Sequence, residues 1–282
     1  MNQSLLTVET TNHFITLTLN RPDSMNPLGA SGDGDAFAAT CDAINGDIDV
    51  RCVILTGAGR AFSAGGDIKA MKDKTGNFGG TAPEIADGYR NNIHKILRAL
   101  YGLRVPLIAA VNGPAIGLGC DLACLADMRI ASDRAKFGVT FLKLGIIPGD
   151  GGTWILPRII GEARAAELFY TGDVIDADTA LDWGLVSRVV EADTLIDEAR
   201  ALAAKIAAMP PHALRQAKNL MRQGRGTSYD TALEMAANAQ ALMHTTADPP
   251  APIWTQVTPS HPAMPTNHRS GLTPARRVQR GQ

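Results

Sequence analysis

Buried strands alternate with helices along the first part of the chain, and this order constrains the fold more than any other feature. Four segments have the apolar runs or the alternation of strands, at residues 13–22, 50–59, 105–113 and 128–132. Helical spacing is found between them at residues 35–47, 84–103 and 120–127. Strands separated by helices usually pair in parallel, so the sequence predicts an α/β fold with substantial parallel pairing.

From Glu162 onward the pattern is mostly helical, with one short apolar strand at residues 185–190. The composition changes at Asp248, because the last 35 residues hold 7 of the 16 prolines and no sustained apolar period. We therefore expect a core over residues 1–200, a helical region over 201–247 and an irregular or disordered tail over 248–282.

Composition limits the classes of partner. Hydrophobic residues make up 45% of the chain and charged residues 20%, and the formal net charge is −1. This balance gives no reason to expect nucleic acid or an anionic membrane as a partner. The N-terminus has no secretory pattern and the longest apolar stretch is too short to cross a bilayer, so we expect a soluble, cytoplasmic protein. The four cysteines show no metal spacing or disulfide density, and we infer buried thiols and no metal.

Two glycine-rich loops share one form, in which a buried strand runs into glycines and a helix begins just beyond. They are "GRAFSAGGDIKAM" (59–71) and "NGPAIGLGCDLA" (112–123). Such loops leave backbone N–H groups free at a helix start, and two of them side by side could hold one oxyanion. The alternative is that the glycines only permit tight turns. Neither loop has a nucleotide-binding signature.

These loops, together with "LNRPDSMNPL", "FGVTFLKLGIIPGDGGTWILPRIIG" and "AAELFYTGDVIDADTALDWGLVSRVV", resemble the enoyl-CoA hydratase/isomerase (crotonase) family over residues 5–246. The resemblance implies a spiral of ββα units, a helical C-terminal trimerisation region, and a homotrimer or a dimer of trimers. It also implies an acyl-CoA thioester as substrate, with coenzyme A entering as part of the substrate and no other cofactor.

The resemblance also assigns site residues. The thioester oxygen would lie between the N–H groups of Ala64 and Leu118, and these two amides count among the catalytic groups. The substrate-binding residues implied in this way are Ala64, Gly65, Gly66, Asp67, Ile68, Leu118 and Phe141. Arg21 and Arg60 would meet the phosphates of coenzyme A.

The acid–base residues depart from the family pattern. Hydratases of the family use two glutamates, which fall at Asp121 and Phe141 here, and phenylalanine can neither accept nor donate a proton. Asp150, in a loop that borders the acyl pocket in the family, is the candidate second acid. The alternative for Asp150 is a helix N-cap, and for Asp121 it is a first-turn acid that complements the helix dipole.

Several functions remain open at this point. The leading one is hydration of a 2-enoyl-CoA by Asp121 and Asp150. The others are an isomerase with Asp121 as single proton shuttle, a hydrolase of a β-diketone or thioester, and a non-catalytic acyl-CoA binder. Of the remaining polar and aromatic residues, we expect His94 at the surface and Trp154 in the core.

Overall fold

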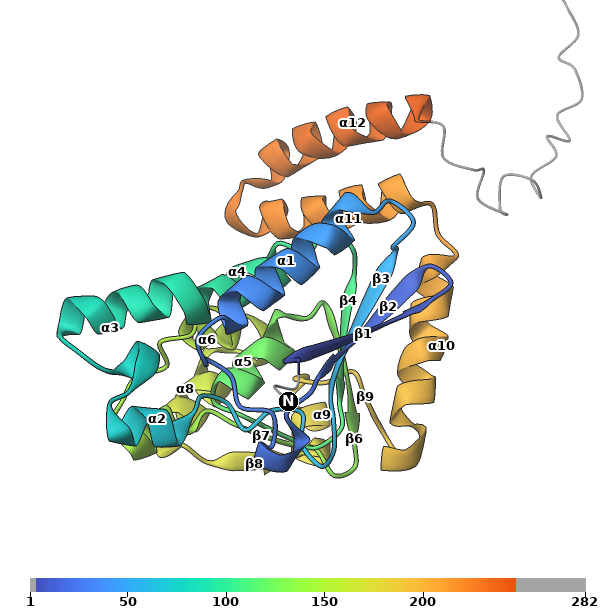
Figure 1. Cartoon of the computed structure of the whole chain (residues 1–282). Helices are drawn as coiled ribbons and strands as arrows, with labels where there is room; N and C mark the ends of the chain where they lie inside the picture. Colours follow the sequence, from blue (N-terminus) through green and yellow to red (C-terminus); the bar gives the residue numbers. More distant parts are fainter. Residues whose placement is uncertain (1–3, 247–282) are drawn as a thin grey trace, which may run out of the picture. The chain divides into compact units, whose positions relative to one another are not determined.

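The structure is a computed structural model that describes residues 4–246 of the chain (Figure 1). The tail expected over residues 248–282 lies outside the described residues. The division into a core and a helical C-terminal region stays a prediction.

A six-stranded sheet forms the centre of the fold. In order across the sheet its strands are β1 (Leu6–Thr11), β2 (Phe14–Leu19), β3 (Cys52–Gly57), β4 (Leu107–Val111), β6 (Met128–Ser132) and β9 (Arg188–Val190). β1 and β2 pair antiparallel, and every other pair is parallel. The expected parallel pairing is thus confirmed. All residues of β4 are buried, as in a strand covered on both faces.

A smaller sheet lies beyond the ends of β3 and β4. It consists of β5 (Pro114–Ile116), β7 (Lys136–Gly138) and β8 (Val174–Asp176), with β5 parallel and β8 antiparallel to β7. Each strand is only three residues long, which is why no alternation in the sequence predicted them.

Helices cover both faces of the large sheet (Figure 1). On one face α10 (Leu195–Ala207) packs four side chains at intervals of four residues against β3, β4 and β6, and these are Leu195, Ala199, Ala203 and Ala207. Their small size lets the helix approach the strands closely. On the other face lie α1 (Asp33–Gly46), α4 (His94–Tyr101) and α5 (Leu118–Leu125), within the larger hydrophobic core.

The remaining helices lie around the ends of the sheets. They are α2 (Ile68–Asp73), α3 (Ala82–Gly88), α6 (Gly152–Ile155), α7 (Pro157–Ile160), α8 (Glu162–Thr171), α9 (Ala177–Asp182), α11 (Pro211–Gln223) and α12 (Tyr229–Thr245). The mostly helical pattern expected after Glu162 is confirmed, and β9 lies within the short strand expected at residues 185–190. Within residues 4–246, no helix combines the length and the apolar character that crossing a membrane requires.

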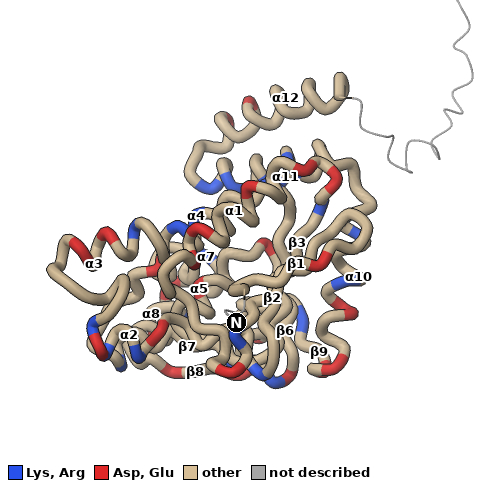
Figure 2. The backbone as a smooth tube through the Cα atoms, viewed as in Figure 1, with Lys and Arg blue, Asp and Glu red and all other residues tan. Residues whose placement is uncertain are grey.

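Acidic and basic residues are interspersed along most elements in the view of Figure 2.

The four cysteines are buried and free. None of the described residues forms a group of three or more side chains suited to a metal ion.

Candidate active site

The two glycine-rich loops lie side by side because they follow adjacent parallel strands, β3 and β4. Ser63 in the first loop pairs with Ala115 in the second. The Ser63 amide donates to the Pro114 carbonyl at 3.1 Å, and the Ile116 amide donates to the Ser63 carbonyl at 3.0 Å. The carboxyl ends of parallel strands are where α/β proteins bind ligands.

A third segment fixes the other side of the first loop and corrects the expectation for Ala64. The Leu28 amide donates to the Gly65 carbonyl, and the Ala64 amide donates to the Met25 carbonyl, both at 2.8 Å. Successive amides of an extended segment point to opposite sides, so the Ala64 N–H points away from Leu118. Ala64 is therefore occupied within the protein and is not the donor that the family resemblance assigned.

Two other amides next to each other are without an acceptor among residues 4–246, those of Gly66 and Leu118. Leu118 is the first residue of α5, whose early N–H groups have no partner within the helix. Gly65 brings the two loops together: its φ is +93°, and a Cβ built there would overlap the Ile116 carbonyl oxygen and lie 3.3 Å from the Leu118 nitrogen. Only glycine permits this approach.

The residues after Gly66 begin α2. The Asp67 carboxylate accepts from the Ala70 amide at 2.9 Å and so caps α2. Ile68, the first residue of α2, is 55% exposed. Contact of either residue with coenzyme A stays a prediction.

Asp121 is buried in α5 with 1% of its surface exposed. Both carboxyl oxygens are without a hydrogen-bond partner among the described residues. Burial raises the pKa of Asp121 well above its usual value, and the neighbouring Cys124 and Asp150 raise it further. A buried carboxyl with a raised pKa and no hydrogen-bond partner among the described residues is a candidate for proton transfer.

Asp150 is also buried, and its Oδ1 has no partner among the described residues. The capping alternative fails, because the N-cap of α6 is Gly151 and no side chain caps this helix. Burial raises the pKa of Asp150 to about 6, while His94 lowers it. The two aspartates thus differ in their neighbours: those of Asp121 raise its pKa further, whereas His94 lowers the pKa of Asp150.

Asp121 and Asp150 line the same cavity, which has a volume of about 520 Å³. Its full lining is His94, Leu97, Arg98, Tyr101, Asp121, Leu125, Gly149, Asp150, Gly151, Trp154 and Ile155. The lining corrects two expectations. His94 faces the cavity, and Trp154 is 43% exposed at its edge, not in the core.

Phe141 stands where the family hydratases carry their second glutamate, and it is buried. Its ring packs at Gly117, where a built Cβ would lie 3.6 Å from the phenylalanine Cζ. Phe141 is not among the described residues that line the cavity of Asp121 and Asp150. A contact between Phe141 and substrate stays a prediction.

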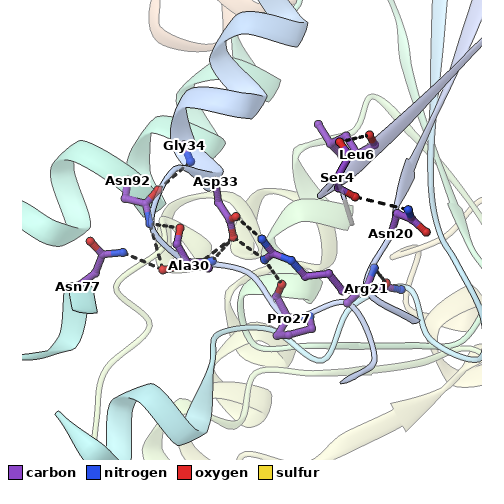
Figure 3. Close-up of polar contacts among 12 residues, drawn as sticks. Ser4, Leu6, Asn20, Arg21, Pro27, Ala30, Asp33, Gly34, Asn77 and Asn92 are labelled. Carbon is purple, nitrogen blue, oxygen red and sulfur yellow. Dashed lines mark hydrogen bonds and ion pairs between the residues drawn. The ribbon is translucent and has the colours of Figure 1, made fainter. Parts of the chain in front are cut away.

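Arg21 is bound inside the protein, contrary to the expectation that it meets phosphates. Its guanidinium makes two hydrogen bonds to the Asp33 carboxylate, at 2.6 and 2.8 Å, and a third to the Pro27 carbonyl at 3.1 Å (Figure 3). Asp33 in turn accepts from the amides of Gly29 and Ala30. The fork geometry favours this ion pair, which fixes the turn before α1.

Comparison with known proteins decides the family. A family model described as enoyl-CoA hydratase/isomerase matches residues 9–249. The chain belongs to the enoyl-CoA hydratase/isomerase family. The resemblance found in the sequence, with its crotonase-type and hydratase-like function, is confirmed at this level.

Individual members of this family cover most of the chain. The 1,2-epoxyphenylacetyl-CoA isomerase of Escherichia coli is 38% identical over 83% of this chain and 88% of its own length. Crotonyl-CoA hydratase of Syntrophomonas wolfei is 38% identical over 82% of this chain and 86% of its own length. The solved structure of enoyl-CoA hydratase from Bacillus anthracis has a TM-score of 0.80 at 36% identity, covering 86% of this chain and 92% of that one. The crotonase-like fold is therefore confirmed as well.

Proposed function

We propose that this enzyme adds water to the double bond of a 2-enoyl-CoA thioester, with Asp121 and Asp150 as its proton-transfer pair. The observation that carries the proposal is that these two carboxyls line one cavity, both buried and each with an oxygen that has no hydrogen-bond partner within residues 4–246. Hydration needs one group to accept a proton from water and another to deliver one to carbon. Two carboxyls with different surroundings can divide this work.

The thioester oxygen would accept hydrogen bonds from the amides of Gly66 and Leu118. Both are free among the described residues, and they come from adjoining loops held together at Gly65. Two amide donors aimed at one carbonyl stabilise the enolate that forms when a nucleophile adds at Cβ. Backbone donors explain how leucine is acceptable at position 118.

The roles of the two aspartates follow from their charges. At neutral pH Asp150, with its pKa of about 6, is mostly a carboxylate. Burial raises the pKa of Asp121 well above its usual value and so favours the protonated form, which can donate a proton. Asp150 would take a proton from water as the water oxygen bonds to Cβ, and the double-bond electrons would pass to the thioester enolate. Asp121 would then give its proton to Cα. Return of the proton from Asp150 to Asp121 completes a cycle in which one water has been added.

The substrate would be an acyl-CoA thioester, with coenzyme A as part of the substrate and no other cofactor. A homotrimer or a dimer of trimers, built through α11 and α12, and a cytoplasmic location belong to the same proposal. Size-exclusion chromatography with light scattering would measure the assembly, and a monomer would contradict it.

A second candidate is isomerisation of an acyl-CoA. The 38% identity to 1,2-epoxyphenylacetyl-CoA isomerase favours it, and so does the phenylalanine at the position of the second family glutamate. One carboxyl can remove a proton from one carbon and return it to another. In that case Asp121 would suffice, and Asp150 would be dispensable.

The test is a substrate panel with matched variants. Purified protein is incubated with 2-enoyl-, 3-enoyl- and 3-hydroxyacyl-CoAs, and hydration, isomerisation and thioester loss are each measured. Asp121→Asn and Asp150→Asn are each expected to lower hydration by about 10² to 10⁴-fold. Asp193→Asn, an exposed aspartate in the short helix Ala192–Thr194, serves as control and is expected to keep full activity.

The panel separates the alternatives. Hydration that survives Asp150→Asn would contradict the proposed pair, and isomerisation that needs only Asp121 would favour the second candidate. Thioester loss would point to a hydrolase. Binding of acyl-CoA without turnover would point to a non-catalytic binder.

A further inference from the structure

Helix α4 directs one row of side chains into the cavity, and His94 is the first of them. The row consists of His94, Leu97, Arg98 and Tyr101. Their spacing of three and four residues places them on one helical face.

A π-helical turn, Tyr89–Ile93, immediately precedes His94 and sets the direction of this face. Asn92, within this turn, is buried and both polar atoms of its side chain are hydrogen-bonded (Figure 3). Its Oδ1 accepts from the Gly34 amide at 2.7 Å. Its Nδ2 donates to the Gly29 and Ala30 carbonyls, each at 3.0 Å. Turns of this kind inside α-helices are frequent at functional sites. The position of His94 is thus fixed by contacts outside its own helix.

His94 contacts the backbone that carries Asp150. Its Nε2 lies 2.8 Å from the Gly149 carbonyl oxygen, one residue before Asp150. A carbonyl can only accept, so Nε2 carries the hydrogen of this bond. The Tyr89 ring packs edge-on against the imidazole, with 6.0 Å between the ring centroids. The imidazole is therefore held from two sides.

The groups that face Asp150 come from three elements. They are Asp121 of α5, Tyr89 of the π-helical turn, and His94, Arg98 and Tyr101 of α4. Of these, His94 acts on Asp150 by favouring its ionised form, whereas Asp121 is a like charge when ionised.

We propose that His94 is a positioning residue for proton transfer, which holds the 149–150 peptide against the cavity and sets the electrostatic environment of the Asp150 carboxyl. This inference rests on the proposed function. It adds a third group to the site that neither of the two family glutamate positions includes. The hydrogen bond and the charge of His94 are separable contributions, and different substitutions remove them.

The experiment compares two variants with a matched control. His94→Gln keeps an N–H donor at the position of Nε2 but has no charge, and His94→Leu removes both. His13→Gln is the control, because His13 also bonds a backbone carbonyl, that of Asp49 at 3.1 Å, at an exposed position. The hydration rate is measured from pH 5 to pH 9, and the Asp150 carboxyl is titrated directly by NMR on protein labelled with ¹³C-aspartate.

We expect His94→Gln to keep plateau kcat within about threefold, since positioning is retained, and His94→Leu to lose about tenfold or more. In both variants the acid limb of kcat/KM and the Asp150 titration should move to higher pH. The His13→Gln control should change neither. If both His94 variants titrate like wild type and keep plateau kcat, the inference is wrong. If His94→Leu does not fold by circular dichroism, the direction of the shift in His94→Gln decides.

The outcome for His94 can be distinguished from the outcome for the proposed function. The NMR titration needs no turnover, so it reports on the His94–Asp150 interaction whatever the reaction is. If Asp150→Asn keeps full activity, Asp150 is not the general base and the proposed function is contradicted. If the Asp150 titration is unchanged in His94→Gln, the role proposed for His94 is wrong, but the proposed reaction is not affected.

Discussion

Gly152 offers a sharp test of where the Asp121 carboxyl must lie. α6 begins at Gly152 and packs directly on α5. A Cβ built on Gly152 would lie 2.9 Å from both Cγ and Oδ2 of Asp121, and closer still to Oδ1. The φ of Gly152 is outside the left-handed region, so alanine is permitted by its own backbone. Gly152→Ala therefore acts on the carboxyl by steric contact alone.

The size of the effect follows from the overlap. To restore ordinary van der Waals contact, the carboxyl or α6 must move by about 1 Å, and a misplacement of that size costs on the order of 10²-fold in rate. We expect kcat for hydration to fall by about that factor while the protein stays folded.

The assay is the loss of ultraviolet absorbance of the conjugated thioester, with thermal unfolding measured in parallel. Gly46→Ala is the matched control, because a Cβ there meets nothing within 4 Å and α1 ends at this residue. A Gly152→Ala enzyme with wild-type kcat would refute the placement of Asp121 as a reacting group.

Three further predictions test neighbouring parts of the site. Gly65→Ala should lower both stability and kcat, because φ is +93° and the new Cβ would overlap the Ile116 carbonyl; unchanged unfolding and turnover would contradict this. The kcat/KM for hydration should fall as the pH drops through about 6, because protonation of Asp150 removes the base; a profile flat from pH 8 to pH 5 would exclude it. Asp121→Asn should raise the midpoint of thermal unfolding at pH 7 while it lowers turnover. The reason is that a raised native pKa means that stability is lost as the pH rises above the ordinary carboxyl range; a lowered midpoint would contradict it.

The sequence predicted the parts of this protein that depend on local pattern. Strand and helix alternation indicated the parallel sheet, and the glycine-rich loops after the second and third predicted strands indicated where the site lies. Both loops are confirmed as neighbours by the pairing of Ser63 with Ala115. Asp121 and Asp150 were also selected from sequence and share one cavity.

The parts that sequence reasoning missed depend on contacts between distant segments. Whether the Ala64 or the Gly66 amide is free is decided by Met25, about forty residues earlier, and no local signal indicates that pairing. His94 turns toward Gly149 because of a π-helical turn anchored by Asn92 to the segment before α1. Trp154 is 43% exposed and contacts Tyr101 of α4 and the Arg158 guanidinium, which lies 4.2 Å from its ring centroid. The contact with Tyr101 joins segments about fifty residues apart, and no local pattern indicates it.

The most direct measurement of the central claim is the carbonyl stretching frequency of a bound thioester. An acyl-CoA labelled with ¹³C at the thioester carbonyl is bound to Asp121→Asn, which prevents turnover, and the isotope-edited infrared spectrum is compared with that of the free ligand. If the amides of Gly66 and Leu118 both donate to this oxygen, the band moves to lower frequency on binding and moves back in Gly65→Ala. A band that stays at the frequency of the free thioester would contradict the account.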